Sequence, residues 1–140
     1  QLRRWLTQVL VTERVIAHEA AVLGVVASDA PVEPDLLPDL TARLEIGSVA
    51  AGALADPLAR AVFARVTAGV DVTAEAVADY RRRNPGRFSS EAQVAAHLRG
   101  AARRRAFRIW LDQRRAALVE LAPGYEHPGD PRQPDNTHRH

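Results

Sequence analysis

Residues Val72–Leu121 read VTAEAVADYRRRNPGRFSSEAQVAAHLRGAARRRAFRIWLDQRRAALVEL, and this stretch decides the fold. Ser90 and Gln93 form a capping-box pattern, in which each side chain satisfies a backbone N–H at the start of a helix. No proline follows until Pro123. Apolar residues recur at a three- or four-residue spacing, at Val94, Leu98, Ala102, Ala106 and Ile109. The pattern predicts one long helix that begins near Glu91 and forms the centre of the fold.

A shorter helix is predicted directly before the long one. Thr73 is a good N-cap, and Val77 and Tyr80 are expected to face inward. Three arginines at 81–83 fall in the last turn, where cations suit the negative end of the helix dipole. The Asn-Pro-Gly sequence at 84–86 then stops the helix.

The composition favours an all-α fold. Apolar residues make up 46% of the 140 residues, but aromatic residues only 5%, and alanine, valine and leucine dominate. Small side chains of this kind favour close helix packing over a strand-rich sandwich. The length suits a single domain with its own core. We therefore expect a small multi-helix domain over residues 1–121, with a long C-terminal helix, followed by an extended tail over 122–140.

The first 24 residues predict an amphipathic helix from Leu2 to Leu23, ended by Gly24. Its expected buried face includes Trp5, which we interpret as a core anchor. The other residues of that face are Val9, Ile16, Ala20 and Leu23.

The middle of the chain predicts shorter helices. Three prolines between residues 31 and 38 indicate a loop, after which a helix is expected to run from residue 38 or 39 to Ile46. Gly47 and Gly52 make the next segment a weak helix candidate. Asp56 and Pro57 then form an N-cap and first-turn pair for a helix that is expected to end at Gly69.

All 19 basic residues are arginine, and the chain contains no cysteine. The absence of lysine removes the usual amine for Schiff-base chemistry, and the absence of cysteine excludes disulfides, thiolate catalysis and cysteine-bound metals. Arginine runs at 81–83 and 103–108 suggest nucleic-acid binding as one hypothesis. Because 17 acidic residues leave a net charge of only +2, we disfavour that hypothesis.

The pattern V-T-x-E-x-V-x-x-Y-x-x-x-N-P-x-x-F at residues 72–88 resembles the segment that precedes the isomerase domain in SurA-type and PpiC-type parvulin chaperones. The residues after it are similar to the long C-terminal helix of those proteins, and residues 2–24 resemble their first long helix. The residues that carry this similarity are Val72, Thr73, Glu75, Val77, Tyr80, Asn84, Pro85, Phe88, Val94, Leu98, Arg105, Ala106, Phe107, Trp110, Leu111 and Arg115.

The chain departs from that family at Phe88, because the long helix follows at once where related chains commonly carry the isomerase domain. The resemblance therefore implies a non-catalytic, SurA-like helical domain that binds an extended polypeptide or a partner protein, with no cofactor. We expect an apolar groove between the first helix and the long one. Its candidate residues are Leu6, Val9, Leu98, Phe107 and Trp110.

The tail from residue 122 supports an alternative function. It holds four prolines and a cluster of imidazole and carboxylate groups that could bind a divalent transition metal. The candidate ligands are His127, Asp130, Asp135, His138 and His140. Under this alternative the chain is a small metal- or substrate-binding enzyme, or an accessory factor of a biosynthetic pathway.

No apolar run approaches the roughly eighteen residues of a membrane span, and no signal-peptide pattern is visible. We therefore expect no membrane-spanning helix and favour a cytoplasmic location. The chain opens at Gln1, at the start of the predicted first helix, so the sequence leaves open a signal before Gln1. The sequence also leaves open whether the chain forms a homo-oligomer. No Walker loop, zinc-protease motif or dinucleotide fingerprint is present.

Overall fold

A long helix, α6 (Glu91–Leu121), forms the centre of the fold, and the other helices pack around it. The computed structural model describes residues 1–32 and 35–121, and within these ranges every regular element is helical. The order before α6 is α1 (Leu2–Leu23), the short 3₁₀ helix η1 (Ala27–Asp29), α2 (Leu40–Ile46), α3 (Ser48–Ala53), α4 (Pro57–Val66) and α5 (Ala74–Arg83). The predicted all-α class with a long C-terminal helix is therefore confirmed.

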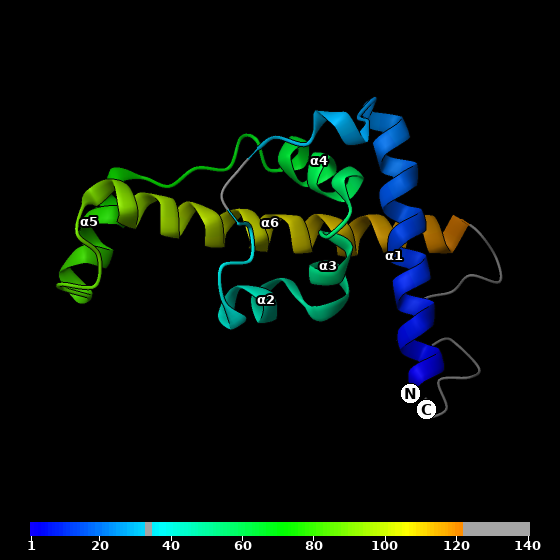
Figure 1. The fold of residues 1–140 in the computed structure, drawn as a ribbon, viewed down its shortest axis with the longest axis horizontal. Coiled ribbons are helices and arrows are strands. Elements are labelled where there is room, and N and C mark those ends of the chain that lie inside the picture. Colours follow the sequence, from blue (N-terminus) through cyan, green and yellow to red (C-terminus); the bar gives the residue numbers. More distant parts are fainter. Residues whose placement is uncertain (33–34, 122–140) are drawn as a thin grey trace.

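The helices are arranged around three parts of α6 (Figure 1). α5 folds back on its N-terminal part, α2 and α3 lie on one side of its middle with α4 on the other, and α1 crosses it near its C-terminal end. The N-terminal half of α1 extends past the other helices. This projection positions the candidate site described below.

Local sequence explains where most helices begin and end. The side chains of Asp39, Asp56 and Thr73 accept backbone N–H groups in the first turns of α2, α4 and α5, at 2.8, 3.1 and 3.0 Å. Such N-caps satisfy donors that have no partner inside the helix. Gly24 ends α1 with φ at 71°, a left-handed conformation that glycine adopts at little cost.

The start of α6 differs slightly from the capping box expected from its sequence. Ser90 Oγ accepts the N–H of Gln93 at 3.2 Å, as expected. The Gln93 side chain, however, accepts the N–H of Ser89 at 2.9 Å, one residue earlier than in the standard box. At the other end, residues 117–121 continue the helix, which decides between the helix and the short strand that their sequence allows.

The core lies where α1, α3 and α4 meet the second half of α6. Phe63 of α4 and Phe107 of α6 are buried there with ring centroids 5.0 Å apart. Val15 and Ile16 of α1 join them, and Leu111 extends the cluster along α6. Tilted aromatic pairs of this kind add about 0.5–1.5 kcal/mol beyond their burial.

Three sequence predictions about helix faces and ends are wrong. Trp5 is 48% exposed, so it does not anchor the core. Ile109, placed on the buried stripe of the long helix, is 59% exposed. The helix that begins at Pro57 ends at Val66, three residues before Gly69. At this end Thr67 Oγ1 donates to the Phe63 carbonyl at 2.7 Å.

The buried side of α6 combines two arginines with the apolar residues Val94, Phe107 and Leu111. Arg103 and Arg104 are each only 7% exposed and lie on the core side, whereas Arg105 is exposed. Arg104 pairs with Glu45 at 3.1 Å and donates to the Leu36 carbonyl at 3.1 Å. The aliphatic stems pack while the guanidinium groups reach acceptors on neighbouring elements.

Candidate functional site: an exposed apolar face on α1

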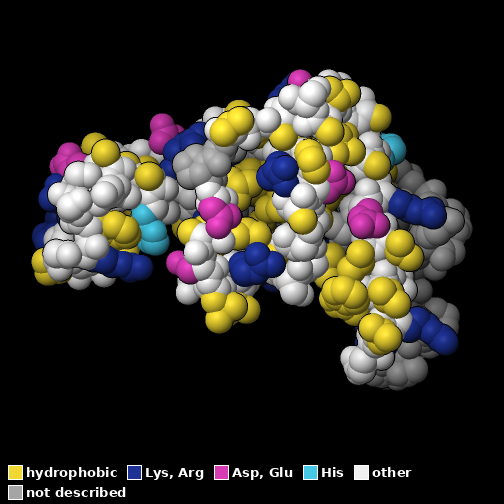
Figure 2. Space-filling model, viewed as in Figure 1, with side chains coloured by type: hydrophobic (Ala, Val, Ile, Leu, Met, Phe, Trp, Pro, Cys, Tyr) yellow, Lys and Arg dark blue, Asp and Glu magenta, His cyan; other side chains and the backbone are white. Residues whose placement is uncertain are grey.

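Five apolar residues cover one side of the first three turns of α1. At about 100° per residue, they fall within about 140° of the helix circumference. We call this surface the α1 apolar face, and it consists of Leu2, Trp5, Leu6, Val9 and Leu10. Leu2, Trp5, Leu6 and Leu10 are 69, 48, 46 and 58% exposed, and Val9 is half-buried. Figure 2 shows apolar side chains gathered on this projecting end of the molecule.

The face is exposed because α1 makes its core contacts with other residues. Burial begins at Thr12, and the buried residues of α1 are Thr12, Val15, Ile16, Glu19 and Ala20. Their directions centre about 80° around the helix from the centre of the α1 apolar face. Residues 11–23 of α1 therefore belong to the core, and residues 2–10 form an amphipathic arm whose apolar face is largely exposed.

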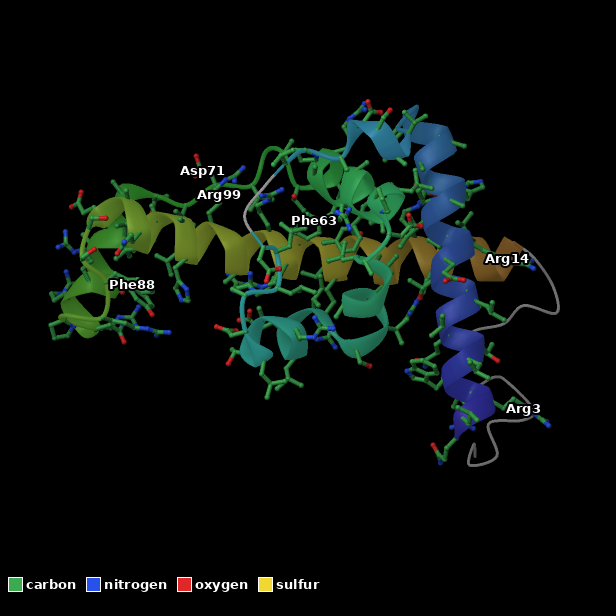
Figure 3. All side chains as sticks on the ribbon, in the orientation of Figure 1. Arg3, Arg14, Phe63, Asp71, Phe88 and Arg99 are labelled. Atoms are coloured by element: carbon green, nitrogen blue, oxygen red, sulfur yellow. The ribbon has the colours of Figure 1, made fainter. Side chains whose placement is uncertain are left out.

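Charged residues border the α1 apolar face. Arg3 is exposed beside it, and the single acidic group in the first sixteen residues is Glu13, at the C-terminal edge of the face. Figure 3 shows Arg3 directed away from the body of the molecule on the outer side of α1. Thr7 Oγ1 donates to the Arg3 carbonyl at 2.9 Å within the helix. The arm thus combines an apolar stripe with a basic N-terminal end.

The five residues predicted to line a groove do not form one surface. Leu6 and Val9 belong to the α1 apolar face. Phe107 is fully buried and contributes no surface, which corrects that prediction. Trp110 is half-buried and stacks on Phe107 with ring centroids 5.6 Å apart. Leu98 lies on the N-terminal half of α6, about 20 Å along the helix from the buried Leu111 near the α1 crossing.

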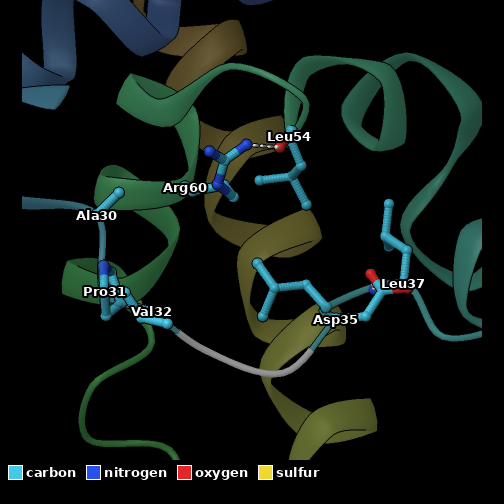
Figure 4. Close-up of a pocket in the computed structure, with 8 residues that line it drawn as sticks. Ala30, Pro31, Val32, Asp35, Leu37, Leu54 and Arg60 are labelled. Carbon is cyan, nitrogen blue, oxygen red and sulfur yellow. Dashed lines mark hydrogen bonds between the residues drawn. The ribbon is translucent and has the colours of Figure 1, made fainter.

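Two hollows flank residues 35–36, where the chain crosses α6. One, of about 430 Å³, is lined by residues 30–32 and 35–37 and by the start of α4, where Arg60 donates to the Leu54 carbonyl at 3.0 Å (Figure 4). The other, of about 270 Å³, is lined by Phe63 and by Arg99, Arg103 and Arg104 of α6.

The arginines of the smaller hollow act as cross-links within the fold. Arg99 Nε donates to the Val70 carbonyl at 3.0 Å, and Arg103 Nε donates to Thr67 Oγ1 at 2.9 Å. The Arg103 guanidinium also lies 5.0 Å from the centroid of the Phe63 ring, a cation–π distance. Gly100 leaves room for Arg104, because a Cβ there would lie 3.3 Å from Arg104 Nη1. These contacts hold the segments around α6 in place.

An aromatic cluster joins α5 to α6. The His97 ring lies 5.0 Å from the Phe88 ring and 5.6 Å from the Tyr80 ring. Burial lowers the pKa of His97 below its ordinary value of 6.5, and the nearby Arg87 and Arg104 lower it further. The neutral imidazole therefore packs as an aromatic group and holds the α5 hairpin against α6.

The arginine runs present less free positive charge than their sequence suggests. Arg82 and Arg83 both pair with Asp79, the latter at 2.8 Å, and Arg81 lies 3.6 Å from Glu91. In the second run, residues 103–108, Arg103 and Arg104 are buried. Phosphate binding needs accessible cationic groups, so this geometry does not favour the nucleic-acid hypothesis.

The proposed metal ligands lie outside the described residues. His127, Asp130, Asp135, His138 and His140 all fall in 122–140, so the metal alternative stays a prediction. Within residues 1–32 and 35–121, no group of three or more His, Asp or Glu side chains is arranged to hold a metal ion. In the same part of the chain, no helix is both long and apolar enough to cross a membrane.

Sequence reasoning missed Leu2, Trp5 and Leu10 as surface residues. It fitted one apolar stripe through Trp5, Val9 and Ile16 to the whole of α1, although the buried residues begin only at Thr12. A signal was available in Glu13, which interrupts the apolar face where the helix changes neighbours. Periodicity alone does not show how far a helix extends past its core.

The chain matches no protein-family model, no curated protein and no solved structure. The resemblance to parvulin-type chaperones therefore stays a prediction, carried by the residues given above.

Proposed function

We propose that this chain is a non-catalytic helical binding domain that holds an apolar segment of a partner polypeptide on the α1 apolar face. The observation that carries the proposal is the exposure of four large apolar side chains on one side of a projecting helix. Contiguous apolar surface of this size, bordered by polar residues, is typical of a protein-interaction site.

The chemistry of the face supports a polypeptide partner. Trp5 offers a large, rigid apolar surface with an indole N–H, a combination enriched at the centres of protein interfaces. Leucines at positions 2, 6 and 10, one helical turn apart, match the spacing by which helices recognise apolar anchors. The resemblance to parvulin-type chaperones points the same way, because the helical part of those proteins helps to bind unfolded polypeptide.

A binding assay on the purified chain tests this proposal. Fluorescence anisotropy with a panel of labelled amphipathic and extended peptides should detect binding that weakens at least tenfold in the Leu6→Asp variant. The matched control is Val22→Asp, since Val22 is 67% exposed on the same helix but lies outside the face. Because both side chains are exposed, both variants should keep the helical circular dichroism of the parent protein.

The proposal fails if no peptide binds, or if the two variants bind equally well. Metal analysis of the purified chain addresses the alternative function. A stoichiometric transition metal that is lost on deletion of residues 126–140 would favour that alternative over the binding domain.

A further inference from the structure

We infer that the α1 apolar face pairs with the same face of a second copy of this chain, in an antiparallel arrangement. This inference rests on the proposed function and names the partner. Three features of the face support it. They are its area, its charge pattern, and the fact that one antiparallel register suits both its charged and its apolar residues.

The area suits a weak, reversible dimer. The exposed parts of Leu2, Trp5, Leu6 and Leu10 amount to roughly 500 Å² of surface, compared with about 800 Å² per partner in a standard stable interface. Pairing would also cover half-buried Val9 and the stem of the flanking Arg3. The buried surface then approaches the lower end of the range for specific complexes.

The charges select the antiparallel orientation. The basic Arg3 lies at the N-terminal end of the face, and the acidic Glu13 lies at its other end. A parallel pair would bring Arg3 of both copies together at one end. An antiparallel pair instead places Arg3 opposite the partner's Glu13, twice by symmetry. Exposed pairs of this kind contribute little affinity, but they set orientation and register.

The apolar residues fit the same register. If the two-fold axis passes level with Gln8 along the helix, Leu6 of one copy lies opposite the partner's Leu10, and Trp5 covers the flank of the partner helix. A symmetric contact of this kind is self-complementary and closes, so it produces a dimer and no larger polymer. The α1 arm projects from the body, so two copies can approach without a clash between their cores.

The absence of cysteine makes the register directly testable. In the antiparallel dimer, Val9→Cys lies close to the two-fold axis and should form a disulfide-linked dimer under mild oxidation. Leu2→Cys should not, because its two sulfur positions would be about 20 Å apart, whereas a disulfide needs Cα atoms within about 7 Å. Cross-linking of both variants to the same extent would overturn the antiparallel register.

Charge reversal gives a second and independent test. Sedimentation equilibrium should show a monomer–dimer equilibrium in the parent chain. Arg3→Glu and Glu13→Arg should each raise the dimer dissociation constant roughly threefold to tenfold, and the double variant should restore it. Reversal at Arg105, which is exposed on α6 far from the face, is the matched control and should have no effect.

The outcomes separate this inference from the proposed function. A chain that stays monomeric at all concentrations, yet binds peptides in a manner that depends on Leu6, overturns the inference and leaves the function standing. A monomer that dimerises only after deletion of residues 122–140 also overturns it, because the chain's own C-terminal residues would then occupy the face. A monomer that binds neither peptide nor a second copy overturns both.

Discussion

Alanine substitutions at Ile16 and Leu6 should have very different effects on stability, although both residues are aliphatic and lie on α1. Ile16 is 3% exposed and belongs to the core cluster with Phe107 and Leu111. Its truncation removes buried methylene groups and leaves a cavity, which typically costs about 2–5 kcal/mol. Leu6 is 46% exposed and lies outside that cluster, so its truncation should cost less than about 1 kcal/mol.

Urea denaturation followed by circular dichroism measures both values. The protein should be dilute, because a dimer would add its own stabilisation to the Leu6 result. For a chain of this size, a loss of about 3 kcal/mol at Ile16 corresponds to a shift of the urea midpoint by about 1.5–2 M. If Leu6→Ala lowers the midpoint as far as Ile16→Ala does, the N-terminal half of α1 is part of the core, and the reasoning about the α1 apolar face is refuted.

Three further predictions concern the rest of the fold. Arg104→Ala should destabilise the chain by about 2–3 kcal/mol in the same assay, since it leaves the one-third-exposed Glu45 without its partner, whereas Arg105→Ala should cost less than about 0.5 kcal/mol. His97 has a lowered pKa in the folded state, so the unfolded chain binds its proton more readily. The stability contributed by the neutral ring is therefore complete above pH 6.5 and falls as the pH drops from 6.5 through the folded pKa; His97→Gln should remove this part of the pH dependence. Gly24→Ala should lower the free energy of unfolding by about 1 kcal/mol because alanine is strained at φ 71°, and an unchanged thermal midpoint would contradict this.

Helix positions could be predicted well from local sequence, because caps and breakers act over a few residues. Asp39, Asp56 and Thr73 cap the helices that their positions indicated, and Gly24 ends α1 as expected. The start of α6 at Glu91 follows from Ser90 and Gln93 in the same way. These features depend on backbone N–H groups near the side chain that satisfies them.

The faces of the two longest helices could be predicted only in part, because they depend on what each helix packs against. Ile16, Ala20 and Val94 are buried as expected. On α6 the apolar stripe that ends at Ile109 looks like a core face, yet the core side carries Arg103 and Arg104. Long arginine side chains can be buried when acceptors on other elements reach them, and Glu45 and Thr67 do so here. Sequence periodicity contains no information about those distant partners.

The candidate site was predicted only in part for a related reason. Leu6 and Val9 were expected to contact a partner and do lie on an exposed face. Leu98 and Phe107 were grouped with them because a groove between α1 and α6 was expected to run along both helices. The helices instead cross at one point near the end of α6, so residues early in α6 lie far from the α1 arm.

The environment of Trp5 tests the central claim most directly. The Trp110→Phe variant leaves Trp5 as the single tryptophan, since the chain has only two. In dilute solution its fluorescence should have the red-shifted emission of a solvent-exposed indole, with efficient acrylamide quenching, and it should shift to the blue as the protein is concentrated or a binding peptide is added. Blue-shifted emission that resists quenching at every dilution would contradict the account, because Trp5 would then be buried within a single chain.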